Sequence, residues 1–327
     1  MSVRFQPVRI HASFRAEALR DKRIASLKAC AIDHGFHYAG VRQAELWLKV
    51  HQAHAPGSVD VEFEGLYRAA AADLAQQLAG QSVHVIGLGS GGGEKETWVL
   101  QALHQHACRL RYTPVDISPE LALLSAEQAR ATIEAHITPV VGDLSLLADA
   151  DDWQEDDPAT SRVYTAFGLT PNFPPSYLLG LLNHSLRPYD QLLLSANLAP
   201  TTHDNDSDYP AAVRELLYQY DNPETRTWLH QVLIDWGIAD KLGPPEFQVA
   251  ELEDIAGFFA YSTWLEDTHL DWEEQPLTAQ KGDRLRLFFS LRYTPKRLAT
   301  KLEALGLIMA KAHITSNGQE GVWRVHR

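Results

Sequence analysis

Residues 83–97 read VHVIGLGSGGGEKET and constrain the fold more than any other stretch of the chain. The apolar run from Val83 to Leu88 has the composition of a buried parallel strand, and a helical spacing of apolar residues begins after Lys95. Between them, glycines occupy positions 87, 89, 91, 92 and 93. A turn without Cβ atoms lets a ligand lie against the backbone at a helix N-terminus. The stretch therefore predicts a strand, a glycine turn and a helix that together bind a ligand.

The glycine spacing does not by itself identify the ligand. Gly87, Gly89 and Gly92 satisfy G-x-G-x-x-G, the dinucleotide-binding fingerprint, which is a weak signal when it stands alone. Residues elsewhere in the chain must therefore decide which adenosine-containing cofactor binds.

Strands and helices alternate along the chain after residue 83. The expected parallel strands are 83–88, 110–115, 137–141, 162–167 and 191–196, and the expected helices include 62–79, 94–106 and 175–186. Ser118 has the character of an N-cap, with Pro119 at the first helical position. Repeated β–α units of this kind predict an α/β fold with a doubly wound, Rossmann-like parallel sheet.

A second region interrupts this pattern. Residues 201–208 read TTHDNDSD, are polar without periodicity and indicate a linker, after which residues 209–236 have helical spacing. Alternating apolar residues predict antiparallel strands at 258–265 and 284–291. A helix at 294–305 and a strand pair at 307–314 and 322–326 follow, and we expect them to return to the α/β unit.

Charge and composition exclude several classes of partner. The chain has 327 residues, 45% of them hydrophobic, and a formal net charge of −13. A negative field of this size repels phosphate backbones, and no basic patch offsets it, so nucleic acid is not an expected partner. The N-terminal segment lacks the apolar block of a signal peptide, and no run is long enough to span a bilayer. We therefore expect a cytoplasmic protein that does not bind membranes.

No metal site is expected. Cys30 and Cys108 have neither metal-ligand nor redox spacing. His104, His106 and Cys108 are two residues apart on a predicted helix, a spacing that cannot converge on one ion. The pair His51 and His54 lacks a third ligand.

Polar residues at the ends of the predicted strands narrow the choice of cofactor. Asp116 ends strand 110–115, where a carboxylate suits the ribose hydroxyls of either NAD or S-adenosylmethionine. Asp143 follows strand 137–141, where it can accept from an adenine amino group, although an N-cap role is the alternative. Asn172 follows strand 162–167, where a substrate group would meet the sulfonium methyl. Together with Gly89, these residues favour S-adenosylmethionine, and a nicotinamide-dependent oxidoreductase is the weaker alternative.

The chain resembles a known family over roughly residues 80–327. The resemblance is carried by Gly87–Gly91 with Glu94-Lys95, Tyr112–Ser118, Val141–Leu144, Asn172–Pro174, Leu186–Asp190, Tyr220–Pro223 and Phe289–Pro295. These motifs resemble those of the histidine-specific S-adenosylmethionine-dependent methyltransferases of ergothioneine biosynthesis and their relatives. The resemblance implies a class I methyltransferase core of residues 61–200 plus 291–327. It also implies an inserted α+β substrate-binding domain of residues 1–60 plus 201–290.

The resemblance also implies roles for particular residues. The positions implied to bind the cofactor are Gly87, Gly89, Gly91, Lys95, Asp116, Asp143 and Leu144. Lys95 would meet the cofactor's carboxylate, Asp116 its ribose and Asp143 its adenine. The positions implied to bind substrate are Tyr38, Asn172, Tyr220, Phe288 and Ser290. Asn172, the catalytic position that holds the amine, and Tyr220 would bind an amino acid by its amine and carboxylate, and Ser290 would contact its side chain.

One departure from the family bears on the substrate. The family has a glutamate that grips the imidazole two residues before the serine, and here that position is Phe288. An imidazole N–H buried without a partner costs about 1–3 kcal/mol. We therefore expect N-methylation of a small amino-acid-like amine other than histidine. Two alternatives stay open: Phe288 faces the core after a one-residue slip in register, or the protein binds S-adenosylmethionine without catalysis. The sequence leaves the oligomeric state undetermined.

Overall fold

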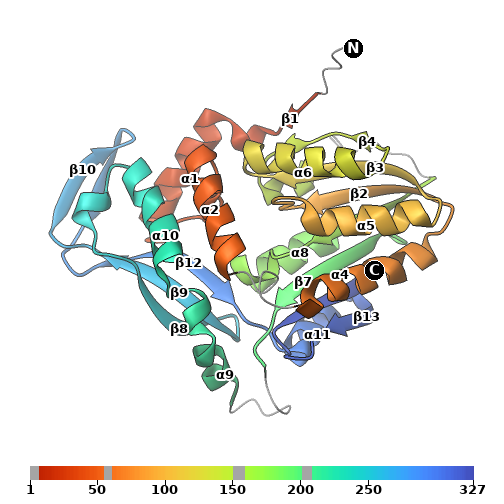
Figure 1. Ribbon diagram of the computed structural model, residues 1–327. Coiled ribbons are helices and arrows are strands. Elements are labelled where there is room, and N and C mark those ends of the chain that lie inside the picture. The colour runs from red at the N-terminus through yellow and green to blue at the C-terminus, as the bar shows by residue number, and fades with distance from the viewer. Residues whose placement is uncertain (1–6, 55–60, 150–158, 201–207) are drawn as a thin grey trace.

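The computed structural model describes residues 7–54, 61–149, 159–200 and 208–327. Of the linker expected at 201–208, only Asp208 lies within the described residues. Figure 1 shows a large sheet with helices on both faces, and beside it a smaller antiparallel sheet with helices α1, α2 and α10. No helix in the described part of the chain is long and apolar enough to cross a membrane.

The large sheet has the strand order β1-β5-β3-β2-β6-β7-β14-β13, with β4 paired to β3. Its strands are β1 (Arg9–Ile10), β2 (Ser82–Leu88), β3 (Arg109–Asp116), β4 (His136–Ile137), β5 (Val140–Val141), β6 (Thr160–Ala166), β7 (Gln191–Asn197), β13 (Ile308–Ile314) and β14 (Glu320–His326). The strands from β1 to β7 pair in parallel, whereas β14 is antiparallel to both β7 and β13. This topology confirms the predicted doubly wound, Rossmann-like fold.

The order of the strands along the chain reverses at β2, which lies between β3 and β6. In doubly wound sheets, ligands bind in the crevice outside the carboxyl ends of the strands at this switch point. The glycine turn directly follows β2, so the topology places it in that crevice.

Helices cover both faces of the large sheet. The helices are α1 (Ala16–Lys28), α2 (Val41–His54), α4 (Val61–Gln77), α5 (Glu94–Gln105), α6 (Pro119–Thr132), α8 (Pro175–Ser185), α9 (Tyr209–Glu215), α10 (Pro223–Asp235) and α11 (Pro295–Ala304). Short 3₁₀ turns are η1 (Ala12–Phe14), η2 (His34–His37), η3 (Leu144–Asp149), η4 (Thr170–Asn172), η6 (Leu217–Gln219) and η7 (Ala239–Lys241). Apolar residues of α4, α5 and α6 form the core on one face, and those of α8, α11 and η3 form the core on the other.

The smaller sheet has the order β12-β9-β8 and is antiparallel. Its strands are β8 (Glu246–Leu252), β9 (Ile255–Thr263) and β12 (Arg284–Leu291), and a separate hairpin joins β10 (Thr268–Trp272) to β11 (Gln275–Ala279). Leu27 of α1, Leu46 of α2 and Trp228 of α10 pack with Phe288 of β12 in one apolar cluster. Helices from two distant parts of the chain therefore share a core with this sheet.

Local sequence signals explain several element ends. The Ser118 hydroxyl accepts from the Leu121 N–H, and Pro119 opens α6, as predicted. The helical stretch expected over 209–236 is divided in the structure, because α9 ends at Glu215 and α10 starts afresh at Pro223. Asn222 caps α10 by accepting from the backbone of its first turn.

The strand expected over 137–141 is also interrupted. Residues 138 and 139 separate β4 from β5. Pro139 lacks an N–H for the strand ladder, which explains the break. The carboxyl end of the predicted strand is nevertheless retained, because Val140 and Val141 pair with the last two residues of β3.

Backbone contacts join the two sheets where β7 and β12 end. Leu198, just beyond β7, forms a parallel bridge with Tyr293, just beyond β12. The Ala199 N–H donates to the Tyr293 carbonyl at 2.8 Å, and the Tyr293 N–H donates to the Asn197 carbonyl at 2.9 Å. This backbone ladder fixes the end of β12 beside the carboxyl end of β7.

Candidate functional site

A cavity of about 970 Å³ lies at the carboxyl ends of the parallel strands and extends to α2 and β12. Most residues predicted from the sequence line it: Tyr38, Gly89, Gly91, Lys95, Asp116, Asp143, Leu144, Asn172, Tyr220 and Phe288. Gly87 and Ser290 do not line this cavity. The topology thus brings together residues from separate strands, helices and loops at one end of the sheet.

The glycine turn has the geometry that its sequence predicts. Gly89, Gly91 and Gly93 have φ angles of 58°, 52° and 80°, in the left-handed region that favours glycine. The Ser90 N–H donates to the Val115 carbonyl at 3.1 Å, which ties the turn to β3. A Cβ on Gly89 would lie 2.6 Å from the Leu169 side chain, so only glycine fits this position without rearrangement.

Asp116 combines a structural contact with a position on the cavity. Its carboxylate accepts from the Gly91 N–H and from the Ser118 N–H, both at 2.9 Å. Burial raises its pKa to about 6, despite these stabilising hydrogen bonds. A carboxylate has more acceptor sites than these two contacts use. Asp116 can therefore accept hydroxyl donors of a ligand while it holds the glycine turn.

The carboxylate of Asp143 already has partners within the protein. It accepts from the Ser145 N–H at 2.8 Å and also from the Ser145 hydroxyl, so it caps the start of η3. Its other oxygen contacts Lys22 Nζ at 3.1 Å, and Lys22 is also 3.0 Å from Asp33. Burial raises the pKa of Asp143, but Lys22 and Ser145 outweigh this and leave the pKa below its ordinary value. The N-cap role is therefore observed, and the same carboxylate also lines the cavity.

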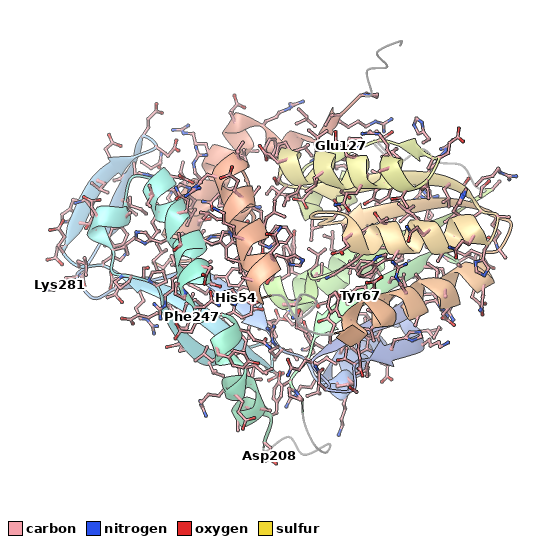
Figure 2. All side chains as sticks on the ribbon, in the orientation of Figure 1. His54, Tyr67, Glu127, Asp208, Phe247 and Lys281 are labelled. Atoms are coloured by element: carbon pink, nitrogen blue, oxygen red, sulfur yellow. The ribbon has the colours of Figure 1, made fainter. Side chains whose placement is uncertain are left out.

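Lys95 lies on an aromatic surface at the side of the cavity. Its Nζ is 5.0 Å from the centroid of the Phe63 ring and 4.8 Å from that of Tyr67. Figure 2 labels Tyr67 on α4, and the Tyr67 hydroxyl donates to Glu320 at 2.6 Å. The cation–π contacts hold the ammonium beside the cavity.

The sequence did not single out two buried acids near Lys95. Glu96 and Glu320 are 2% and 3% exposed and line the cavity. Burial raises the pKa of each carboxyl to about 7. Glu96 accepts from the Thr165 hydroxyl at 3.1 Å. No sequence motif around Glu96 or Glu320 indicates that the carboxyl group there is buried.

Asn172 presents an unpartnered acceptor. Its Nδ2 donates to the Gly168 carbonyl at 3.3 Å and to the Tyr38 hydroxyl at 3.4 Å. A carbonyl only accepts, so this contact fixes which end of the amide is the NH₂ group. The Asn172 Oδ1 is buried and has no hydrogen-bond partner among the described residues. A buried acceptor left unpaired is destabilising, and a ligand N–H would satisfy it.

Phe288 is part of an aromatic wall. Its ring stacks on His34 at 4.5 Å, meets Trp228 edge-on at 5.3 Å and lies 6.0 Å from Tyr220. Phe288 is 2% exposed and still lines the cavity. Burial holds the pKa of His34 well below its usual range, so the wall is uncharged. The β12 ladder shifts register between Arg286 and Phe288, and the ring keeps to the cavity side.

Ser290 and Gly87 act from behind the cavity. The buried Ser290 hydroxyl donates to the Tyr220 hydroxyl at 2.9 Å, so its contact with the cavity is indirect. Gly87 lies within β2, where an added Cβ would come 3.1 Å from the Tyr112 hydroxyl and 3.2 Å from Glu96. Gly87 therefore allows close packing beneath the glycine turn.

The sheet order and the glycine turn after β2 have the architecture of a class I, Rossmann-like methyltransferase core. Residues 59–212 match the model of a family described as "Histidine-specific methyltransferase, SAM-dependent". The match covers 154 of the 327 residues and agrees with the resemblance seen in the sequence. The protein is accordingly an S-adenosylmethionine-dependent methyltransferase, and the nicotinamide alternative is set aside.

Several solved structures share similarity with this chain. The mitomycin 7-O-methyltransferase MmcR is 13% identical, with 96% of this chain and 69% of that chain covered and a TM-score of 0.39. The sugar N-methyltransferase from Streptoalloteichus sp. is 13% identical, with coverages of 88% and 94% and a TM-score of 0.38. The carbon methyltransferase CurJ is 9% identical, with coverages of 94% and 69% and a TM-score of 0.39. No curated protein sequence matches this chain significantly.

Proposed function

We propose that the protein transfers a methyl group to the amine of a small amino-acid-like substrate. The observation that carries this proposal is the buried, unpartnered Oδ1 of Asn172 on the wall of the cavity. An amine N–H would donate to this oxygen, because the amide's NH₂ end is already occupied by Gly168 and Tyr38. A carbon nucleophile has no polar hydrogen to donate to this oxygen, and between nitrogen and oxygen the family resemblance favours nitrogen.

The cofactor roles follow from the positions around the cavity. We propose that the backbone of Gly89 and Gly91 lies against the cofactor, that Asp116 accepts from its ribose and that Asp143 accepts from its adenine amino group. Lys95 would pair with the cofactor's carboxylate, and Leu144 would pack on the adenine. The left-handed glycine turn supports this fit, since side chains in the turn would fill the space.

The chain divides by function in the same proposal. Residues 61–200 plus 291–327 would form the S-adenosylmethionine-binding core, and residues 1–60 plus 201–290 would form the substrate-binding domain. The cavity supports this division, because its aromatic wall comes from η2, α2, α10 and β12. The N-terminal strand β1 is an exception, since it pairs with β5 in the large sheet.

The residues around Asn172 would orient the acceptor. Bound S-adenosylmethionine supplies an electrophilic methyl group, whose bond to sulfur breaks as the bond to nitrogen forms. Asn172 Oδ1 would accept an amine N–H and so direct the nitrogen lone pair, while the Tyr38 hydroxyl supports the amide from behind. Orientation of this kind supplies a large share of the rate in bimolecular transfers. The aromatic wall would keep water from the reacting atoms.

The same wall supports a substrate other than histidine. Phe288 has no hydrogen-bonding group, and its neighbours on the wall are rings. An imidazole N–H facing Phe288 would lose its partner, at about 1–3 kcal/mol. An aromatic or aliphatic side chain would pack against the ring without that loss.

Methyl transfer from labelled S-adenosylmethionine to a panel of amines tests the proposal. The panel contains histidine, tryptophan, tyrosine, phenylalanine and leucine, and product mass spectra locate the methyl group. We expect N-methylation, with histidine a poor acceptor, and a loss of turnover in Asn172→Ala. Asn183→Ala, on α8 away from the cavity lining, is the matched control and should retain activity. Transfer to oxygen or carbon alone, or full activity of Asn172→Ala, would refute the proposal.

A further inference from the structure

Arg292 is a buried cation with no carboxylate partner among the residues that the structure describes. It follows β12 directly, is 2% exposed and lines the cavity. Its guanidinium donates to the Ser290 hydroxyl at 3.1 Å, the Leu291 carbonyl at 3.2 Å and the Gln219 amide oxygen at 3.1 Å. All three acceptors are neutral. Burial of a charge is unfavourable unless an opposite charge compensates it, so this position calls for an anion.

The groups around Arg292 compensate its charge only in part. Its guanidinium lies 5.2 Å from the Tyr220 ring centroid and 4.9 Å from that of Phe258, which gives two weak cation–π contacts. Glu320 lies near enough to feel the charge of Arg292, yet its hydrogen bond comes from Tyr67. Burial raises the pKa of Glu320 to about 7, so this carboxyl is only partly ionised at neutral pH. The positive charge of Arg292 is therefore only partly compensated by the protein, and an anion in the cavity would compensate the rest.

The direction of the hydrogen bonds from Arg292 determines which neighbouring hydroxyl group is left to donate. A guanidinium only donates, so the Ser290 oxygen accepts from it and the Ser290 proton must go elsewhere. That proton goes to the Tyr220 oxygen, 2.9 Å away. The Tyr220 hydroxyl proton is then left to donate, and no acceptor for it occurs among the described residues. Because Tyr220 lines the cavity, a second donor is available beside Arg292.

The cavity thus has an acceptor for an amine at Asn172 and donors for an anion at Arg292 and Tyr220. We infer that Arg292, together with Tyr220, binds the carboxylate of the substrate and so restricts the enzyme to amino acids over their amides and simple amines. A guanidinium suits a carboxylate because two parallel N–H groups meet two oxygens. This inference rests on the proposed function, since it names the charged group of the same substrate. Gln219 holds the guanidinium in position from one side.

Calorimetry on the protein saturated with S-adenosylhomocysteine tests the inference. The ligands are phenylalanine, leucine and histidine, each compared with its carboxamide and with the corresponding decarboxylated amine. We expect at least one acid to bind about 10- to 100-fold more tightly than its amide, as a charge-assisted pair predicts. Arg292→Met should reduce that ratio to near one, and Arg292→Lys should restore it in part.

Two controls separate binding from structural support. Arg284→Met changes an exposed arginine on the same strand, stacked on Tyr261, and should leave the ratio unchanged. If Arg292 only supports Tyr220, Arg292→Met will weaken acid and amide equally and the ratio will persist, which overturns the inference. A wild-type ratio near one overturns it without any variant. Methyl transfer measured on the same ligands tests the proposed function separately from the inference about Arg292. Tighter binding of the acid with no N-methylated product would contradict the proposed function but would leave Arg292 as an anion-binding residue.

Discussion

Lowering the pH from 7 to 5 should weaken binding of S-adenosylhomocysteine through Asp116. Its carboxyl is 6% exposed, and burial raises its pKa to about 6 in the free protein. The ionised carboxylate can accept hydrogen bonds from hydroxyl groups on both oxygens. The protonated carboxyl carries one O–H group, which is a donor and needs an acceptor of its own. If only the ionised form binds the ribose well, affinity falls as the pH passes below 6.

The size of the effect follows from the titration of Asp116. With a pKa of about 6, roughly nine tenths of Asp116 is ionised at pH 7 and roughly one tenth at pH 5. The dissociation constant should therefore rise about tenfold over this interval, equivalent to about 1.4 kcal/mol. Asp143 stays ionised throughout, because its pKa lies below its ordinary value. The adenine end of the proposed site then contributes little to the change.

The fold should not fail over the same interval because of Asp116. Its pKa is higher in the folded protein than in the unfolded chain, so the folded state binds more protons between the two values. The contribution of this carboxyl to stability therefore increases as the pH falls through 6. Loss of affinity without loss of the thermal transition is the expected pattern.

Calorimetric titrations at pH 7, 6 and 5 on wild type and Asp116→Asn provide the assay. Glu96 and Glu320 also titrate near pH 7 and line the cavity, so the difference between the two profiles isolates Asp116. Asp116→Asn should bind weakly at every pH and lack the tenfold component. A wild-type dissociation constant that does not change, or a variant with the same pH profile as wild type, would refute the reasoning.

Three further predictions concern selectivity and stability. Phe288→Glu should raise the turnover of histidine relative to that of phenylalanine. It should also lower the melting temperature, because it places a carboxylate among buried rings. An unchanged ratio of the two turnover rates would count against a role for Phe288 in selectivity. Gly257→Ala should lower the free energy of unfolding by about 1–3 kcal/mol, because its Cβ would lie 2.5 Å from the Ser290 carbonyl oxygen. The control Gly65→Ala, with open space at a helical position, should instead stabilise by up to about 1 kcal/mol in urea titrations. Asn222→Ala should cost about 1 kcal/mol by removing the cap of α10, and Asn222→Asp should retain most of the stability.

The sequence predicts the large sheet well because its strands are buried on both faces. Such strands leave continuous apolar runs, and residues 83–88 and 191–196 are examples that the structure confirms. The hairpin of β10 and β11 is not predicted, because most of its residues alternate between exposed and half-buried positions and Pro276 lies within β11. The break before α10 had a signal in Asn222-Pro223, but the apolar periodicity on both sides obscured it.

The candidate site was predictable where strand ends determine position. Asp116, Asp143 and Asn172 each follow a parallel strand, and the topology alone brings such positions to one edge of the sheet. Arg292 lies within the motif Phe289–Pro295, but the sequence indicates neither its burial nor that of Glu320, because nothing in a sequence distinguishes a buried charge from a solvated one. The contact of Lys22 with Asp143 joins residues far apart in the chain and depends on tertiary packing.

The place of β14 in the large sheet has a consequence for the growing polypeptide. β14 lies between β7 and β13, so β7 gains its second neighbour only when residues 320–326 are available. During synthesis, residues 191–197 therefore leave the ribosome before their second neighbouring strand has been made. One edge of β7 stays unpaired until the smaller sheet and then β14 have been synthesised. An uncovered edge of an apolar strand is a template for pairing with other chains. Ribosome stalling or premature termination before residue 320 is thus expected to yield chains that associate with one another, and chaperones that bind extended segments would be needed over this interval.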